Sequence, residues 1–507
     1  MSAIETTAPF PILTALVLLP AVAALALQLA PSDRAASRVA LAAMAAELVI
    51  AAGVLLGFRP ALAQTQFAER VEWIPTIGAV YHVGVDGLSV LFLPLTALTA
   101  LLALVSSWRG VRYHPRGFLA SLLLLEAATM GIFVSLDLLL FFLFWEAMLV
   151  PTYALIRVWG VGPERQAAAA KYALYMLVGS APMLVAIALL GINARAAAAA
   201  GPGGYTFDLP ALLAVPVPPG LQLVVFFAFA FSFAVKSPLF PFHSWLPGAL
   251  LEGPAGVAIF LVGLKLGIYG FLRFAIPLAP DAAREWGWAV AALGVASILY
   301  GGLVALTQPN LRRLLAFAAL THVGLATVGV FSLNQQGVQG ALLLMVNVAV
   351  SATGLALLAG ALHARLGSTE LTSLGGLARY APRLAAAFLV FGLAGIGLPG
   401  TSGFPAELLV FIGAFRAQPP LAALALLGAI LGAAYFLSFF ERAFLGPATR
   451  EAVRTIRDLR PREAAAAAVL ATAILAVGAF PGPLLEITDE AARALVQRVE
   501  SRPAAAR

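Results

Sequence analysis

The chain has 507 residues, of which 62% are hydrophobic and 11% charged, with a net charge of +7 and a mean hydropathy of +0.96. Soluble domains carry far more charge, so this composition excludes a soluble fold and predicts a polytopic membrane protein. The absence of cysteine excludes disulfides, thiolate zinc sites and cysteine-ligated iron–sulfur clusters in this chain. No glycine-rich turn follows a predicted strand, which argues against the usual nucleotide sites.

About 20 apolar residues cross a bilayer as a helix, and the sequence predicts an all-α fold with about fourteen such spans. The connections are short except at 59–86 and 194–220, so residues 1–507 are expected to form a single integral membrane domain. The first residues lack a basic signal-peptide segment and include Glu5, so the first span is expected in the mature protein. The predicted spans are 10–29, 38–58, 87–108, 117–135, 137–158, 169–193, 221–249 (broken), 255–277, 285–307, 312–332, 337–363, 384–415 (broken), 420–444 and 463–485.

The arginines predict the orientation of these spans. With the N-terminus outside, eighteen arginines fall on the inside and ten on the outside. Because basic residues concentrate in cytoplasmic loops, we expect both termini on the outer, periplasmic side of a bacterial inner membrane.

A glutamate lies near the middle of the span at 137–158. Glu146 is flanked by Trp145 and Met148, with Pro151 one turn further on. A carboxylate in this position must be paired with a cation or protonated. Lys236 is the natural partner, and a neutral, hydrogen-bonded glutamic acid is the alternative.

The three lysines of the chain, Lys171, Lys236 and Lys265, all fall within predicted spans. A lysine inside a membrane costs roughly 2.5–3.5 kcal/mol on insertion scales. A GC-rich genome would explain why lysine is rare in this chain. It does not explain why the three lysines fall within spans. Since a buried lysine can release its proton and an arginine cannot, these positions are candidates for proton exchange. The alternative is a lysine whose head reaches the interface, which fits Lys265 poorly because apolar residues flank it on both sides.

His322 is the only histidine well inside a span, at 312–332. Its ordinary titration range suits a proton relay. A hydrogen-bonded core histidine is the alternative on this stretch alone.

Two spans contain residues that cannot continue a regular helix. A broken helix in a membrane must be buried in protein or line a wet cavity. The two spans lie five helices apart and therefore run in opposite directions, and each carries one ionisable residue, Lys236 or Glu407. This is the pattern of inverted repeats with ion sites at the breaks, expected over 117–277 (helices 4–8) and 285–444 (helices 9–13). The helix-breaking residues are Pro238, Pro241 and Pro247 in the seventh span, and Gly395, Gly397, Pro399, Gly400 and Gly403 in the twelfth.

Five motifs together resemble the chain M (subunit 4) family of antiporter-like membrane subunits in proton-translocating NADH–quinone oxidoreductase, respiratory complex I. The likeness extends from about residue 8 to residue 485. The wider family includes subunits of multisubunit cation/proton antiporters and membrane-bound hydrogenases. The motifs are FFLFWEAMLVPTYALIRVWG, AVKSPLFPFHSWLP, GLKLGIYGFLRFAIPLAPDA, QPNLRRLLAFAALTHVG and LPGTSGFPAELLVF.

The resemblance implies two proton half-channels joined by a buried polar axis. Glu146 and Lys236 would form a glutamate–lysine pair, Lys265 and His322 the central relay, and Glu407 the terminal residue. Quinone reduction elsewhere in the complex would drive the cycle. FMN, iron–sulfur clusters and quinone would belong to partner subunits, and the direct partners would be other membrane-arm subunits, including two sister antiporter-like chains.

Some residues depart from the family pattern. Leu250 and Val348 stand where the family usually has histidines, although Asn347 remains. Water could replace a histidine as carrier, or the chain could belong to a divergent complex. Glu47 and Glu126, both in mid-span, are unexplained by the resemblance. Each is either a protonated or interface-paired carboxyl group, or an extra proton site, as Lys171 could also be.

Three functions compete at this point. The first is a proton-pumping subunit of an energy-converting oxidoreductase, favoured by the stretch RFAIPLAPDA and by Glu407. The second is a subunit of a cation/proton antiporter or membrane-bound hydrogenase. The third, a membrane scaffold without transport, gives no reason for buried lysines.

Overall fold

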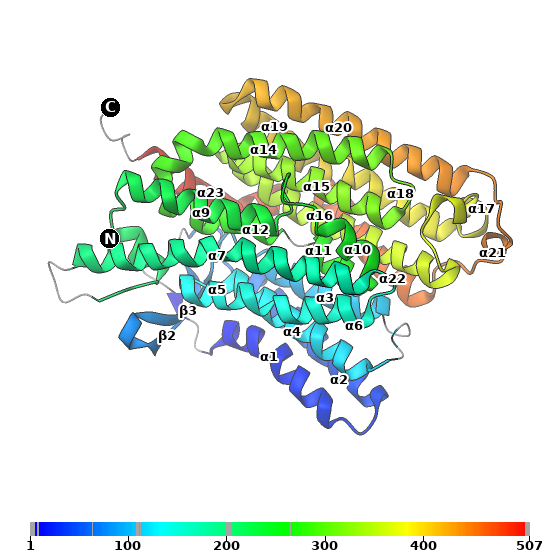
Figure 1. Ribbon diagram of the computed structural model, residues 1–507, viewed down its shortest axis with the longest axis horizontal. Helices are drawn as coiled ribbons and strands as arrows, with labels where there is room; N and C mark the ends of the chain where they lie inside the picture. The colour runs from blue at the N-terminus through cyan, green and yellow to red at the C-terminus, as the bar shows by residue number, and fades with distance from the viewer. Residues whose placement is uncertain are drawn as a thin grey trace.

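Long apolar helices run side by side along the longest dimension of the molecule in the computed structural model (Figure 1). The structure describes residues 6–7, 10–62, 64–107, 111, 113–198, 204–263 and 265–501. Within these residues, twelve helices are long and apolar enough to cross a membrane, and two shorter apolar helices, Phe92–Ser107 and Pro382–Gly395, complete the predicted set. The predicted all-α, polytopic fold is confirmed.

The first half of the chain forms the side of the bundle that contains α1 and α2 in Figure 1. The span at 137–158 consists of two helices, α5 and α6, which meet at Met148. The helices are α1 (Ile12–Ala26) with the 3₁₀ turn η1 (Leu27–Leu29), α2 (Asp33–Gly57), α3 (Phe92–Ser107), α4 (Pro115–Val134), α5 (Leu138–Ala147), α6 (Leu149–Trp159), α7 (Arg165–Ala198), α8 (Leu209–Ala214) and α9 (Pro219–Lys236).

The second half adds a central helix, α16, that is buried along most of its length. The helices are α10 (Leu246–Glu252), α11 (Ala255–Gly263), α12 (Leu266–Gly270), the π-helical segment η3 (Phe271–Ala275), α13 (Ile276–Leu278), α14 (Pro280–Leu306), α15 (Leu311–Val330), α16 (Gln335–Leu366), η4 (Leu371–Ser373), α17 (Leu377–Tyr380), α18 (Pro382–Gly395), α19 (Gly403–Ala417), α20 (Pro419–Phe440), the π-helical segment η5 (Glu441–Leu445), α21 (Glu451–Arg454), α22 (Pro461–Ala479) and α23 (Gly482–Glu500).

Three features differ from the prediction. The stretch 59–86, expected as a loop, contains an antiparallel hairpin of β2 (Gln66–Ile74) and β3 (Ala79–Val85), with β1 (Thr6–Thr7) beside β2 and the 3₁₀ turn η2 (Pro75–Ile77) between the two long strands. The last span ends at Ala479, and the amphipathic helix α23 follows it. The span at 255–277 is interrupted at Lys265, whose φ of −103° and ψ of 63° are not helical. A side chain at Gly267 would lie 2.0 Å from Ser237 Oγ, so the backbone packs closely against the end of α9 here.

The two spans predicted to be broken are broken. Helix α9 ends at Lys236, α18 ends at Gly395, and α10 and α19 begin only several residues later. The same two backbone hydrogen bonds occur at each break, because the chain makes the same irregular turn twice. They are Leu239 N to Ala234 O (2.9 Å) and Phe242 N to Leu239 O (2.6 Å) at the first break, and Leu398 N to Leu393 O (3.0 Å) and Thr401 N to Leu398 O (3.1 Å) at the second.

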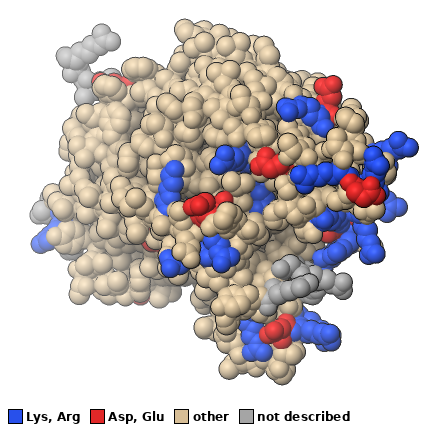
Figure 2. All heavy atoms as spheres, turned by 45° about the vertical axis from the view of Figure 1, so that its right-hand side comes forward, with Lys and Arg blue, Asp and Glu red and all other residues tan. Residues whose placement is uncertain are grey.

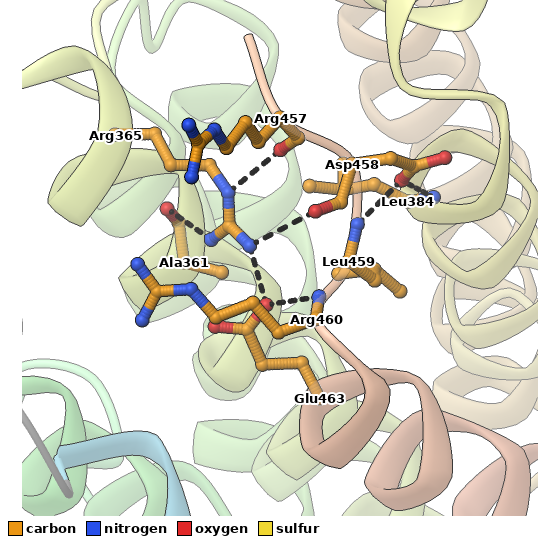
Figure 3. A network of polar contacts seen from close by, with 8 residues as sticks. All are labelled: Ala361, Arg365, Leu384, Arg457, Asp458, Leu459, Arg460 and Glu463. Carbon is orange, nitrogen blue, oxygen red and sulfur yellow. Dashed lines mark hydrogen bonds and ion pairs between the residues drawn. The ribbon is translucent and has the colours of Figure 1, made fainter.

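Lysine and arginine side chains gather toward the end of the bundle that carries α17 and α21 (Figure 2). There Arg365, near the end of α16, donates to Arg457 O (2.9 Å), to Asp458 O (3.3 Å) and to the Glu463 carboxylate (Figure 3). The Asp458 carboxylate in turn accepts from Leu384 N at the start of α18 (3.0 Å). This network ties α16 to the first turns of α18 and α22.

Candidate functional site

Lys236 lies at the first helix break, beside an aromatic ring. Its Nζ is 4.8 Å from the centre of the Trp145 ring, an arrangement that stabilises a cation. Glu146, the next residue on α5, attracts Lys236 electrostatically. No direct salt bridge joins the two among the residues that the structure describes. Tyr172 and Thr152 join Lys236 in lining a cavity of about 30 Å³, which is large enough for water.

Lys265 lies between this cavity and the second half of the bundle. Its side chain is only 4% exposed, and the next residue, Leu266, lines the cavity beside Lys236. On the other side, Lys265 interacts electrostatically with His322 on α15. The interruption of the helix at Lys265 therefore falls where the two halves of the bundle meet.

A second cavity, of about 20 Å³, lies beside the second helix break. Its polar lining consists of Thr321, His322, Glu407 and Tyr435, together with the backbone of Gly395. His322 Nε2 lies 2.7 Å from Gly395 O, and it must be the donor because a carbonyl only accepts. Nδ1 of the neutral ring is then an acceptor, and it has no hydrogen-bond partner among the described residues. His322 can therefore take up a proton at Nδ1.

Asn347 on α16 holds both sides of the second break. Its Nδ2 donates to Ala394 O at the end of α18 (3.2 Å), and its Oδ1 accepts from Ser402 Oγ (2.7 Å), just before α19. This role of Asn347 was not predicted from the sequence. The available signal was an amide side chain in the middle of the span 337–363. Val348 stands where the family usually has a histidine, and its apolar side chain is buried.

The other candidate residues lie elsewhere. Pro238 and Pro241 belong to the first break, and Pro399 and Gly400 to the second. Leu250 is buried. Lys171 is exposed on the outer face of α7 and lines neither cavity. Glu47 and Glu126 are fully buried in α2 and α4, and they also line neither cavity.

Replacing Gly397 with alanine should disturb Glu407 directly. A Cβ at Gly397 would lie 2.5 Å from Glu407 Oε2, so the carboxyl group would have to move. Gly400→Ala is a matched control, because both glycines have a positive φ (69° and 91°) but a Cβ at Gly400 meets nothing within 4 Å. We expect proton translocation in vesicles to fall several-fold more for Gly397→Ala than for Gly400→Ala at equal protein level. Equal losses would show that backbone strain alone matters.

Two matching helix breaks, each beside a small cavity lined by an ionisable side chain, are typical of an ion-translocating membrane protein with a helical bundle. The sequence profile of the family described as "NADH:quinone oxidoreductase/Mrp antiporter, TM" matches residues 135–432. The chain belongs to this family.

Similar proteins cover almost the whole chain. This chain is 38% identical over 471 residues to NADH-quinone oxidoreductase subunit M of Rhodobacter capsulatus, and the alignment covers 92% of this chain and 91% of that protein. It is also 38% identical over 505 residues to NAD(P)H-quinone oxidoreductase chain 4 1 of Synechococcus sp. (strain JA-3-3Ab), covering 97% and 94%. A chain of respiratory complex I from Thermus thermophilus with bound NADH matches with a TM-score of 0.87 at 35% identity, covering 96% of this chain and 99% of that chain.

Proposed function

We propose that the chain is the antiporter-like, proton-translocating membrane subunit of a bacterial NADH–quinone oxidoreductase. The observation that carries this function is the pair of small cavities at the two breaks, each lined by an ionisable side chain, with Lys265 between them. Relatives that align with nearly the full chain are named as subunits of NADH-quinone or NAD(P)H-quinone oxidoreductase, and this supports the assignment of the chain to that complex. Its partners are then the other membrane-arm subunits, including sister antiporter-like chains.

Protons pass along a row of ionisable groups in this proposal. The carboxylate of Glu146 stabilises the positive charge of Lys236. Lys236 exchanges protons with water in the first cavity. Lys265 passes the proton to Nδ1 of His322, and Glu407 receives it in the second cavity. Leu250 and Val348, which stand where the family usually has histidines, line neither cavity, so the carrier in this proposal is water inside the two cavities, which have room for it.

Two inverted repeats, 117–277 and 285–444, are part of the same proposal. The matching hydrogen bonds at the two breaks support it. So do the π-helical segments η3 and η5, which lie in the last turns of the eighth span and of the thirteenth, the corresponding spans of the two repeats.

The redox reaction belongs to partner subunits in this proposal. A chain without cysteine cannot ligate an iron–sulfur cluster through thiolates, so the clusters are assigned to other chains. FMN and quinone are assigned to partner subunits with them. Both termini face the periplasm, and the arginine-rich end faces the cytoplasm.

Glu407→Gln tests the function. In membrane vesicles of the native host, we expect this variant to lose most NADH-driven proton translocation while NADH oxidation by an artificial acceptor in the peripheral subunits persists. Glu451→Gln, an exposed position on α21, is the matched control and should pump normally. Proton translocation that needs a sodium gradient and no NADH would instead identify the second candidate, a cation/proton antiporter subunit, whose family shares the same sequence profile.

A further inference from the structure

The segment that follows Lys265 has an irregular backbone at both ends. The helix α12 is only 5 residues long, from Leu266 to Gly270. Lys265, directly before it, is not helical, and the π-helical segment η3 begins directly after it. In a regular helix, an unbroken ladder of backbone hydrogen bonds would fix the direction of each side chain. Here the position of Lys265 depends on the contacts that hold α12.

A buried arginine in η3 binds this segment to the N-terminal half of the chain. The side chain of Arg273 is only 6% exposed, and its Nη1 and Nη2 donate to Oδ2 and Oδ1 of Asp86, both at 2.6 Å. Two parallel hydrogen bonds of this kind fix direction as well as distance. Asp86 directly follows β3, and its Oδ1 also accepts from Leu88 N (2.9 Å), so the turn before α3 holds the carboxylate in place.

Tyr269 connects this ion pair to Lys265. The tyrosine is fully buried on α12. Its hydroxyl accepts from Arg273 Nε (3.0 Å) and donates to Phe133 O on α4 (3.0 Å). Its backbone N donates to Lys265 O (3.3 Å). A row of direct contacts therefore runs from Asp86 through Arg273 and Tyr269 to the backbone of Lys265.

We propose that the three side chains of this row are positioning residues for Lys265. They hold α12 so that Lys265 lies between the first cavity and His322. The proposal rests on the proton-transfer role of Lys265 in the proposed function, and it adds the residues that fix its place. Arg273 is suited to hold and not to carry a proton, because arginine does not release one. Since a displacement of about 1 Å can lower the rate of a step roughly 10²-fold, loss of this anchoring should impair proton transfer.

Hydrogen–deuterium exchange of backbone amides tests the positioning without relying on transport. In the intact complex, peptides that cover residues 265–270 should exchange several-fold faster in Tyr269→Phe and in Arg273→Lys than in the wild type. Phenylalanine keeps the ring and removes only the hydroxyl group. Lysine keeps the positive charge but cannot form the two parallel hydrogen bonds to Asp86.

Arg365→Lys is the matched control for this measurement. It makes the same substitution at another buried arginine, which pairs with Glu463 at the arginine-rich end of the bundle. Exchange over 265–270 should be unchanged in this variant. Wild-type exchange over 265–270 in Tyr269→Phe would overturn the proposal. If Arg273→Lys does not assemble, Tyr269→Phe is still a complete test, since it removes a single hydroxyl group.

Proton translocation separates positioning from a general loss of stability. Tyr269→Phe should lower translocation several-fold in the wild type but cause no further loss in Lys265→Ala, because no lysine side chain is then left to position. Equal fold losses in both backgrounds would overturn the proposal. Normal translocation by Lys265→Ala would refute the proposed function of Lys265 and not the anchoring of α12, which the exchange measurement decides by itself.

Discussion

Replacing Lys265 with arginine should yield a protein that assembles with its partners but translocates protons no better than Lys265→Ala. The lysine is buried between the first cavity and His322. Arginine keeps the positive charge but does not release a proton at any accessible pH. Since a positioned proton-transfer group typically contributes roughly 10²-fold or more to a rate, we expect translocation to fall at least about tenfold in both variants.

The measurement is proton translocation in sealed vesicles at matched subunit content. The comparison separates two roles for Lys265, because a residue that only balances a nearby carboxylate needs charge and not proton release. In that case arginine would preserve function apart from modest steric losses. Near-normal translocation by Lys265→Arg would remove this residue from the relay and leave Lys236 as the lysine with a transport role.

Replacing Glu146 with glutamine should abolish most proton translocation while leaving assembly intact. Glutamine has nearly the same shape as glutamate, so the packing of α5 against its neighbours is preserved. It lacks the negative charge that attracts Lys236, so the lysine loses its electrostatic partner. We expect a loss of roughly tenfold, in line with the removal of a proton-transfer partner.

Translocation and subunit content are measured together for this variant, with Glu451→Gln as the control at an exposed position. A second variant, Glu146→Asp, keeps the charge but shortens the side chain, and it should retain more activity than the glutamine variant. Wild-type translocation by Glu146→Gln would show that this glutamate is structural.

Several features of the molecule were predictable from the sequence because they are exceptional in a membrane. A lysine, a glutamate or a histidine in an apolar span is costly unless it is paired or used, so Lys236, Glu146 and His322 were recognisable without coordinates. Proline and glycine cannot continue a helix, so the two broken spans were also predictable, and both breaks lie within the predicted stretches.

Other features depended on contacts between distant parts of the chain. The close approach of Gly267 to Ser237 accompanies the interruption of the helix at Lys265, and Asn347 gains its role only from α18 and α19 lying beside α16. Glu47 and Glu126 were each a single unexplained acid in the sequence, and only the structure shows that both are fully buried on helices that pack against each other. Local composition determines which residues are costly to bury, whereas the packing of helices far apart in sequence decides which of them share a cavity or a hydrogen bond.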